Sequence, residues 1–121
     1  MRTVIYNQGF NRIENRNIIR LEHAKLNRLL DEERRVIETL IGSIKQQIEA
    51  APHRLFDVRL IWNKLNNHTI VQSLRQKINL LTDAYPQFLS QVIAVHQRLE
   101  EKAIDTLQVV RQIAQKSILC Q

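Results

Sequence analysis

The chain has 121 residues, of which 44% are hydrophobic and 25% are charged, and these proportions are typical of a folded domain and not of a disordered chain. It contains only two glycines and two prolines, which disfavours a sheet protein because hairpin turns depend on such residues. The net charge of +6 favours nucleic acid or acidic proteins as partners. We therefore expect a single all-α domain over residues 1–121.

Targeting and membrane features are not evident in the sequence. The longest apolar runs are far shorter than the roughly 20 residues that span a bilayer. The first ten residues lack the apolar region and the small-residue cleavage site of a signal peptide. The single cysteine, Cys120, has no partner for an intrachain disulfide. We therefore expect a cytoplasmic protein that does not enter a membrane.

The first half of the chain predicts one long helix. Residues 1–10 include Gly9 and show no helical period, and we interpret them as an N-terminal arm. From about residue 11 to residue 50, only Gly42 interrupts a run of helix-forming residues, and Pro52 then ends the helix. At helical spacing, the hydrophobic residues form one broad stripe, made of Ile19, Leu26, Leu29, Leu30, Ile37, Leu40, Ile41, Ile44 and Ile48.

Three further helices are predicted in the second half. Residues 52–66 carry hydrophobic residues at helical spacing, and Thr69 and Gln72 fit a capping box that begins a helix over residues 69–85. Pro86 then marks the start of a long final helix over residues 86–119. The two shorter helices together about equal one long one. We therefore predict an antiparallel bundle of two long helices (about 11–50 and 86–119) and two shorter ones (about 52–66 and 69–85).

Basic residues follow one edge of the first predicted helix. Arg12, Arg16 and Arg20 are four residues apart, and like charges at this spacing repel by a few tenths of a kcal/mol. An external polyanion would compensate that repulsion. The predicted nucleic-acid-binding residues are therefore Arg12, Arg16, Arg20, His23, Arg34 and Lys45. The alternative is a solvated flank, or a flank paired with acidic residues of another helix.

Two apolar residues are candidates for binding a protein partner. Trp62 lies among the basic residues Arg59, Lys64, Arg75 and Lys77, but these scatter over several helix faces. We therefore interpret Trp62 as a core or interface anchor and not as a base-stacking platform. Ile104 interrupts an outer face of the last helix that is rich in glutamine, and an amide-rich face with an apolar centre would suit protein docking.

Two polar residues fall on apolar helix faces. Glu33 lies within the stripe of the first helix, so it must be paired or protonated. We expect it to meet a cation across the bundle or to mark a contact with another chain. His96 is interpreted as a satisfied core histidine. The histidines and the lone cysteine lack metal-ligand spacing, and no glycine-rich phosphate loop exists. We expect no catalytic residue, metal, cofactor or small-molecule substrate.

Two short segments resemble known enzyme families. Arg16, Asn17 and His23 resemble the Arg-Asn to His spacing of HEPN-type ribonucleases, which implies RNA cleavage, although that family places these residues near a later helix. Arg34, Gly42 and Lys45 look like a fragment of the long helix of the small helical chorismate mutases, whose cationic residues clasp a dicarboxylate. The acid and base positions that this family has later in its chain are not found here.

These observations favour a non-enzymatic helical subunit that acts by protein–protein assembly. We expect it to form a homo-oligomer or to bind a protein partner within a nucleoprotein complex, with its basic flank on the nucleic-acid backbone. In size and charge, the chain resembles the small helical subunits of ribonucleoprotein machines such as CRISPR effector complexes. The alternative is a chaperone or adaptor that binds only proteins, and the third is a HEPN-like ribonuclease.

Overall fold

The computed structural model describes the backbone of residues 2–119 and the side chains of residues 12–118. Its elements are helix α1 (Arg2–Ala50), helix α2 (Val58–Asn66), helix α3 (Thr69–Ala84), a short 3-10 helix η1 (Pro86–Phe88) and helix α4 (Leu89–Leu119). No strand occurs within this described part of the chain. The predicted all-α class is therefore confirmed.

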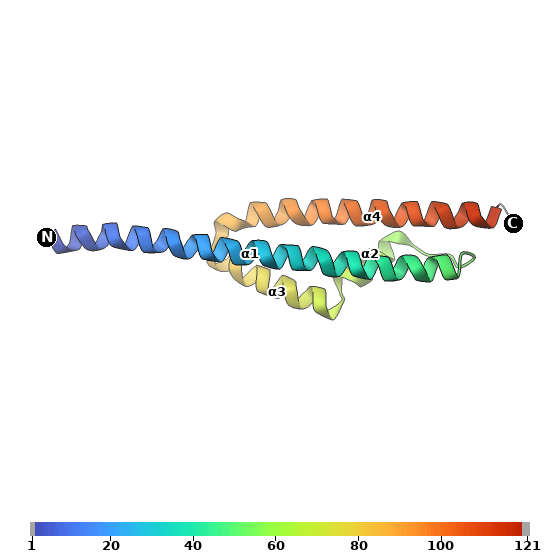
Figure 1. Cartoon of the computed structure of the whole chain (residues 1–121), viewed down its shortest axis with the longest axis horizontal. Coiled ribbons are helices and arrows are strands. Elements are labelled where there is room, and N and C mark those ends of the chain that lie inside the picture. The colour runs from blue at the N-terminus through green and yellow to red at the C-terminus, as the bar shows by residue number, and fades with distance from the viewer. Residues whose placement is uncertain (1, 120–121) are drawn as a thin grey trace.

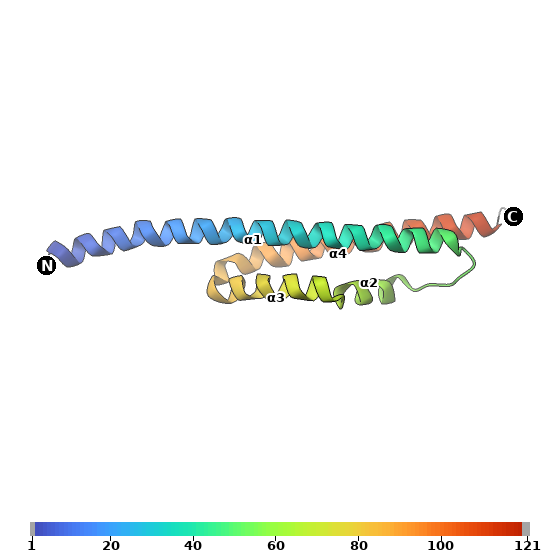
Figure 2. The same ribbon diagram turned by 60° about the horizontal axis from the view of Figure 1, so that its bottom comes forward.

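The helices form an up–down–up arrangement of three arms. Helix α1 is the first arm, α2 and α3 together form the returning arm, and α4 is the third (Figures 1 and 2). Residue numbers increase in the same direction along α1 and α4 at the positions where the two helices meet. Asn27 contacts Gln91, Glu33 contacts His96 and Glu38 contacts Lys102. The two long helices are therefore parallel to each other. The broken middle arm carries the chain back to its starting end, so α4 runs in the same direction as α1 (Figures 1 and 2).

Helix α1 is longer than predicted and projects beyond the bundle. It begins at Arg2, so residues 2–10 are not the non-helical arm that we predicted. No proline precedes Pro52, and a single glycine costs a helix only about 1 kcal/mol, so Gly9 does not end it. The N-terminal part of α1 extends past the ends of α3 and α4 (Figures 1 and 2). Every side chain from 12 to 18 is exposed on this projecting segment.

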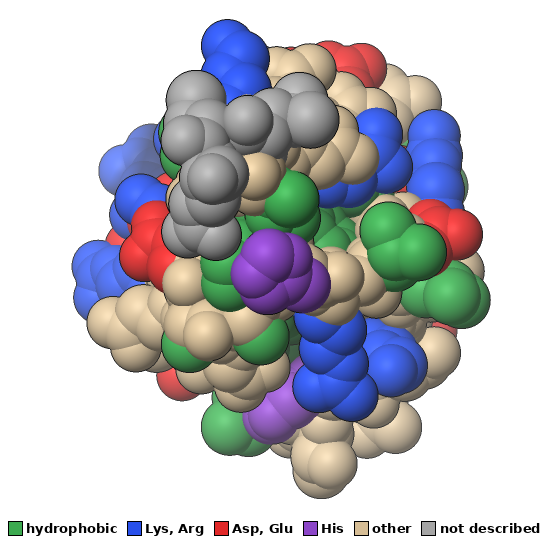
Figure 3. All heavy atoms as spheres, turned by 90° about the vertical axis from the view of Figure 1, so that its right-hand side faces the viewer, with side chains coloured by type: hydrophobic (Ala, Val, Ile, Leu, Met, Phe, Trp, Pro, Cys, Tyr) green, Lys and Arg blue, Asp and Glu red, His purple; other side chains and the backbone are tan. Residues whose placement is uncertain are grey.

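Helix α2 begins six residues later than predicted, at Val58. The cause is Asp57, whose Oδ1 accepts hydrogen bonds from the backbone N–H groups of Arg59 (2.8 Å) and Leu60 (3.3 Å) and so caps the helix. Residues 51–57 form a connection without helix. Its Leu55 therefore lies outside the helix and is 93% exposed. At this end of the molecule, hydrophobic side chains lie next to histidine, lysine and arginine side chains (Figure 3).

The start of α3 also differs from the predicted capping box. The helix does begin at Thr69, but its cap is His68, whose Nδ1 accepts from the backbone N–H of Ile70 at 3.2 Å. Gln72 does not reach back to Thr69 and instead donates to the backbone oxygen of Asn66 at 2.6 Å. These contacts tighten the turn between α2 and α3, so the two short helices follow each other closely.

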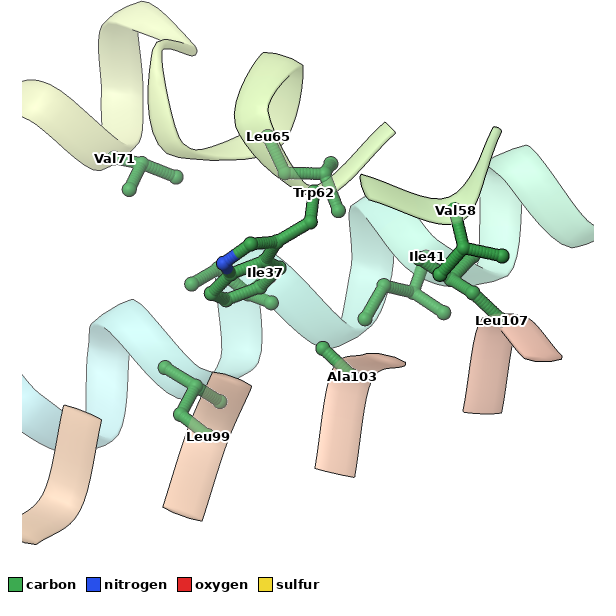
Figure 4. Packing of buried hydrophobic residues seen from close by; sticks show 9 residues of the cluster. All are labelled: Ile37, Ile41, Val58, Trp62, Leu65, Val71, Leu99, Ala103 and Leu107. Carbon is green, nitrogen blue, oxygen red and sulfur yellow. The ribbon is translucent and has the colours of Figure 1, made fainter. Parts of the chain in front are cut away.

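The core runs along the axis of the bundle where the three arms meet. Its central cluster joins all four α-helices (Figure 4) and consists of Ile37, Ile41, Val58, Trp62, Leu65, Val71, Leu99, Ala103 and Leu107. A second cluster around Leu26, Ile78 and Phe88 holds the end near η1, and a smaller one around Ile48 and Val110 holds the opposite end. Full burial of one such large side chain contributes about 1.5–3 kcal/mol. These clusters begin at Leu26, so the projecting segment of α1 has no core of its own.

Candidate nucleic-acid interface

Three of the predicted basic residues are exposed near the projecting end of α1. The side chains of Arg12, Arg16 and Arg20 are exposed. None of the ion pairs within residues 12–118 involves them. Their successive Cα atoms rise by about 6 Å per step along the helix axis, since each residue adds 1.5 Å. We call these three residues the arginine ladder.

His23 is not part of this exposed edge. Its Nε2 lies 2.8 Å from Oε1 of Gln91, and the amide nitrogen of Gln91 donates in turn to Oδ1 of Asn27 at 2.8 Å. The imidazole also lies against the ring of Phe88, with 5.3 Å between the ring centroids. His23 therefore connects α1 to the start of α4, and its role as a nucleic-acid contact stays a prediction. The position of α4 creates this connection, and sequence spacing along α1 does not contain it.

Arg34 and Lys45 are exposed, but acidic residues of α1 neutralise them. Arg34 pairs with Asp31 at 2.7 Å and with Glu38 at 3.0 Å, while Lys45 lies 3.9 Å from Glu49. The hydrogen bond from Arg34 holds the pKa of Asp31 below its usual value, and the charge of the neighbouring Arg35 adds to the effect. The expectation that these two residues continue an uncompensated basic edge was therefore wrong.

A groove between α1 and α4 lies on the same side as the arginine ladder. Its volume is about 330 Å³, and it is lined by Asn27, Leu30, Asp31, Arg34, Glu38, Gln91, Val95, Arg98, Leu99 and Lys102. On an ideal helix, Arg16, Asn27 and Arg34 fall within about 20° of one another. Helix α4 supplies two further basic residues to this side, Arg98 and Lys102. Sequence reasoning missed both, because no pattern within one helix shows which side of another helix it will join.

The two predicted partner-binding residues are used within the chain itself. Trp62 is 5% exposed and packs in the central cluster among Ile37 and Val71 (Figure 4). Ile104 is half-buried against the same cluster. Trp62 is therefore the core anchor that one of our two interpretations gave, and partner binding by either residue stays a prediction. The exposed hydrophobic residues of the projecting part of α1 are instead Ile13, Ile18 and Leu21.

Glu33 meets a cation across the bundle, Arg75, as one of our two expectations stated. Its side chain is fully buried, and its two oxygens contact Arg75 of α3 and His96 of α4. His96 is half-buried and hydrogen-bonded, which confirms its interpretation as a satisfied histidine of the bundle. This network joins all three arms at one level. The sequence pattern did not single out Arg75, which is one of several basic residues near Trp62 that lie on different helix faces.

The structure bears on the two short resemblances only through the positions of their residues. Arg16 and Asn17 are exposed on the projecting segment, whereas His23 turns toward Gln91. Arg34 of the second resemblance is bound by Asp31 and Glu38. Within residues 12–118, no group of three or more His, Cys, Asp or Glu side chains is arranged to hold a metal ion.

Comparisons with known proteins add no assignment. The chain gave no match to known protein families, to curated proteins or to solved structures. Among the described helices, none combines the length and the hydrophobicity needed to cross a membrane. The arginine ladder and the adjoining groove are therefore interpreted from their own geometry.

Proposed function

We propose that this chain is a non-enzymatic helical subunit that acts by assembly and contacts the backbone of a nucleic acid through the projecting part of α1. The observation that carries the proposal is the arginine ladder. Three exposed arginines without an ion-pair partner in residues 12–118 stand on a helix that other helices leave open. Arginine binds phosphate through charge-assisted and often bidentate hydrogen bonds. A polyanion would relieve the repulsion along the ladder.

The contact proposed for the described side chains is with phosphates. Stacking on unpaired bases needs exposed aromatic rings. The aromatic residues among the described side chains are Phe56, Trp62, Tyr85 and Phe88, and all four are buried or half-buried. Recognition through arginine alone is independent of sequence and depends strongly on salt. The proposed activity is therefore backbone binding, to which Arg98 would add from the groove.

Assembly with a protein, either a partner or a second copy, is supported by the same segment. A single helix of this length is marginal in water, because most helical stability in proteins comes from packing. Ile13, Ile18 and Leu21 are exposed on this part of α1. A neighbouring chain that covers them would hold the segment in helical form while the ladder faces the nucleic acid. We propose a cytoplasmic setting for this complex.

Substitution of the arginine ladder tests the proposal. We expect the variant carrying Arg12→Gln, Arg16→Gln and Arg20→Gln to bind a generic duplex oligonucleotide more weakly than the unsubstituted chain. The plot of log affinity against log salt concentration should also become shallower by about 2 to 3 units, since each phosphate contact contributes about 0.9. Fluorescence anisotropy over a salt series measures both quantities.

A matched control removes three charges elsewhere. Arg54, Lys64 and Lys77 are exposed and take part in none of the ion pairs within residues 12–118. Their joint change to Gln alters the net charge equally and should leave most of the salt dependence in place. If both variants weaken oligonucleotide binding equally, net charge alone explains the loss and the proposal of a specific ladder is contradicted. No loss of binding in the ladder variant would contradict the proposal and favour an adaptor that binds only proteins.

A further inference from the structure

A cleft opens on the other side of the bundle, above the buried Glu33. It has a volume of about 280 Å³ and lies between α2, α3 and α4. Its lining residues are Trp62, Asn66, Arg75, Ile93, His96, Gln97 and Glu100. It does not share a residue with the groove beside the arginine ladder. It is therefore a separate candidate site.

The buried Glu33 forms hydrogen bonds with two residues that line the cleft, Arg75 and His96. Its Oε2 accepts from Nε of Arg75 at 3.1 Å, and its Oε1 lies 2.8 Å from Nε2 of His96. The carboxylate is fully buried, whereas the side chains of Arg75 and His96 are 23% and 28% exposed. A buried carboxylate that orients an arginine and a histidine toward a cleft pre-organises both for a ligand, as outer-shell partners do in binding sites.

The groups that remain available in the cleft are mainly hydrogen-bond donors. The contact to Glu33 uses Nε of Arg75, and the two terminal nitrogens of this guanidinium make no hydrogen bond within residues 12–118. Nδ1 of His96 is likewise not engaged by the described residues. Because Nε2–H of His96 donates to the Glu33 carboxylate, Nδ1 donates only when the imidazole is positively charged and accepts when it is neutral. The free N–H groups of Arg75 suit the oxygens of an anion.

The acidic groups near the cleft are already committed, so the cleft does not suit a cation. Both oxygens of Glu33 are hydrogen-bonded, and Glu100 at the rim lies 3.4 Å from Arg59. One acceptor remains in the wall, because Oδ1 of Asn66 is buried and has no hydrogen-bond partner among the described residues. A buried acceptor of this kind costs about 1–3 kcal/mol unless a donor reaches it.

We propose that this cleft binds a small ligand through an oxyanion group, a carboxylate or a phosphate, held by the terminal nitrogens of Arg75, with Nδ1 of His96 donating a further hydrogen bond when its imidazole is positively charged. A hydroxyl on the same ligand would donate to Oδ1 of Asn66, and its apolar part would lie against Trp62 and Ile93. This inference goes beyond the proposed nucleic-acid function and does not depend on it. The arginine ladder and the cleft lie on different helices and share no side chain.

Trp62 is the only tryptophan of the chain and provides a specific reporter for the test. The full chain is titrated with sodium acetate and, separately, with sodium phosphate at constant ionic strength, while the fluorescence of Trp62 is recorded. We expect a saturable change in the millimolar range, typical of a ligand with few atoms. Saturation by acetate alone would assign a carboxylate site, and saturation by phosphate alone would assign a phosphate site. No saturable change with either anion into the tens of millimolar would overturn the proposal.

Substitutions separate the cleft from general charge effects. Arg75→Lys keeps a cation beside Glu33 but loses the planar fork, so we expect affinity for the effective anion to fall at least about tenfold. Arg98→Lys, on the opposite groove, should leave the affinity unchanged, as should substitution of the arginine ladder. Equal weakening by Arg75→Lys and Arg98→Lys would contradict a specific site.

A second measurement uses the unsubstituted chain, so it tests the proposal even if the Arg75→Lys variant does not fold. Nuclear magnetic resonance of the isotope-labelled chain follows all backbone amides during the same titration. We expect the largest shift changes at Asn66, Arg75 and Gln97. Changes that gather instead at Arg12, Arg16 and Arg98 would show non-specific anion binding and overturn the proposal.

Discussion

At the residue scale, the three members of the Glu33 network do not contribute equally. Glu33 has no exposed surface, whereas Arg75 keeps 23% of its side chain in contact with solvent. Arg75→Met therefore leaves a buried carboxylate with only His96 as partner, and we expect it to lower the free energy of unfolding by about 3–5 kcal/mol. Glu33→Met should cost less, because the freed arginine can turn toward water. Urea denaturation followed by circular dichroism measures both changes.

A double substitution isolates the pairing energy from the loss of either side chain. Combining Glu33→Met with Arg75→Met removes both charges, and replacement of a buried ion pair by apolar residues is often neutral or stabilising. We expect the double variant to be more stable than Arg75→Met alone. Glu32→Met, at an exposed neighbouring position, serves as the control. A double variant that is as unstable as the sum of the single variants would show that the two residues do not interact.

Asp31 shows a second effect at this scale, a dependence on pH. Its hydrogen bond from Arg34 lowers the pKa of the carboxyl below its usual value of 3.8. Because the folded state favours the charged form, the stabilisation is present above the usual pKa and is lost as pH falls through the lowered one. We expect the titration midpoint of Asp31, followed by nuclear magnetic resonance, to lie below 3.8. Arg34→Gln should raise it and Arg98→Gln should not; an unchanged midpoint in Arg34→Gln would refute the assigned cause.

At the element scale, a single cap decides where α2 begins. Asp57 accepts hydrogen bonds from two backbone N–H groups at the start of this nine-residue helix. We expect Asp57→Ala to lower the free energy of unfolding by about 1 kcal/mol. The control is Asp83→Ala, which removes an exposed acid from the last turn of α3. An acid there opposes the helix dipole, so this change should be neutral or slightly stabilising. Thermal denaturation of both variants is the measurement.

At the scale of the whole molecule, α1 consists of a packed part and a projecting part. All side chains from residue 12 to residue 18 are exposed, whereas Leu26, Ile37 and Ile48 are buried in three successive core clusters. We expect deletion of residues 1–18 to leave the denaturation midpoint of the bundle unchanged, because the side chains described there, 12–18, make no part of the core clusters. Amide hydrogen exchange of the full chain should be fast in 12–18 and slow in 26–41.

Amide hydrogen exchange measured at several protein concentrations tests whether a second copy of the chain covers the projecting segment. Slow exchange in 12–18 that appears only at high concentration would show that a second copy covers the segment. Slow exchange in dilute solution, or a marked loss of stability on deletion, would contradict an uncovered segment. The same truncated chain lacks Arg12 and Arg16 and should bind the oligonucleotide more weakly, while it keeps the anion response of Trp62, since the cleft lies entirely within the bundle.

The sequence by itself determined the helical class, the approximate helices and most of the inward faces. Hydrophobic residues at helical spacing correctly placed Leu26, Leu30, Ile37 and Ile41 in the core, because the period is a property of the helix itself. The exposed arginine ladder was found in the same way. Glu33 was recognised as a buried acid that needs a partner, because a carboxylate on an apolar stripe has few alternatives.

Only the tertiary structure decided how these helices use one another. The direction of α4 relative to α1, the capture of His23 by Gln91 and the pairing of Glu33 with Arg75 and His96 join residues more than 40 positions apart. The same is true of the groove shared with Arg98 and of the cleft beside Trp62. A helical period states which residues share a face but not which neighbour that face meets. That choice is made by the packing of side chains between elements, which no local pattern contains.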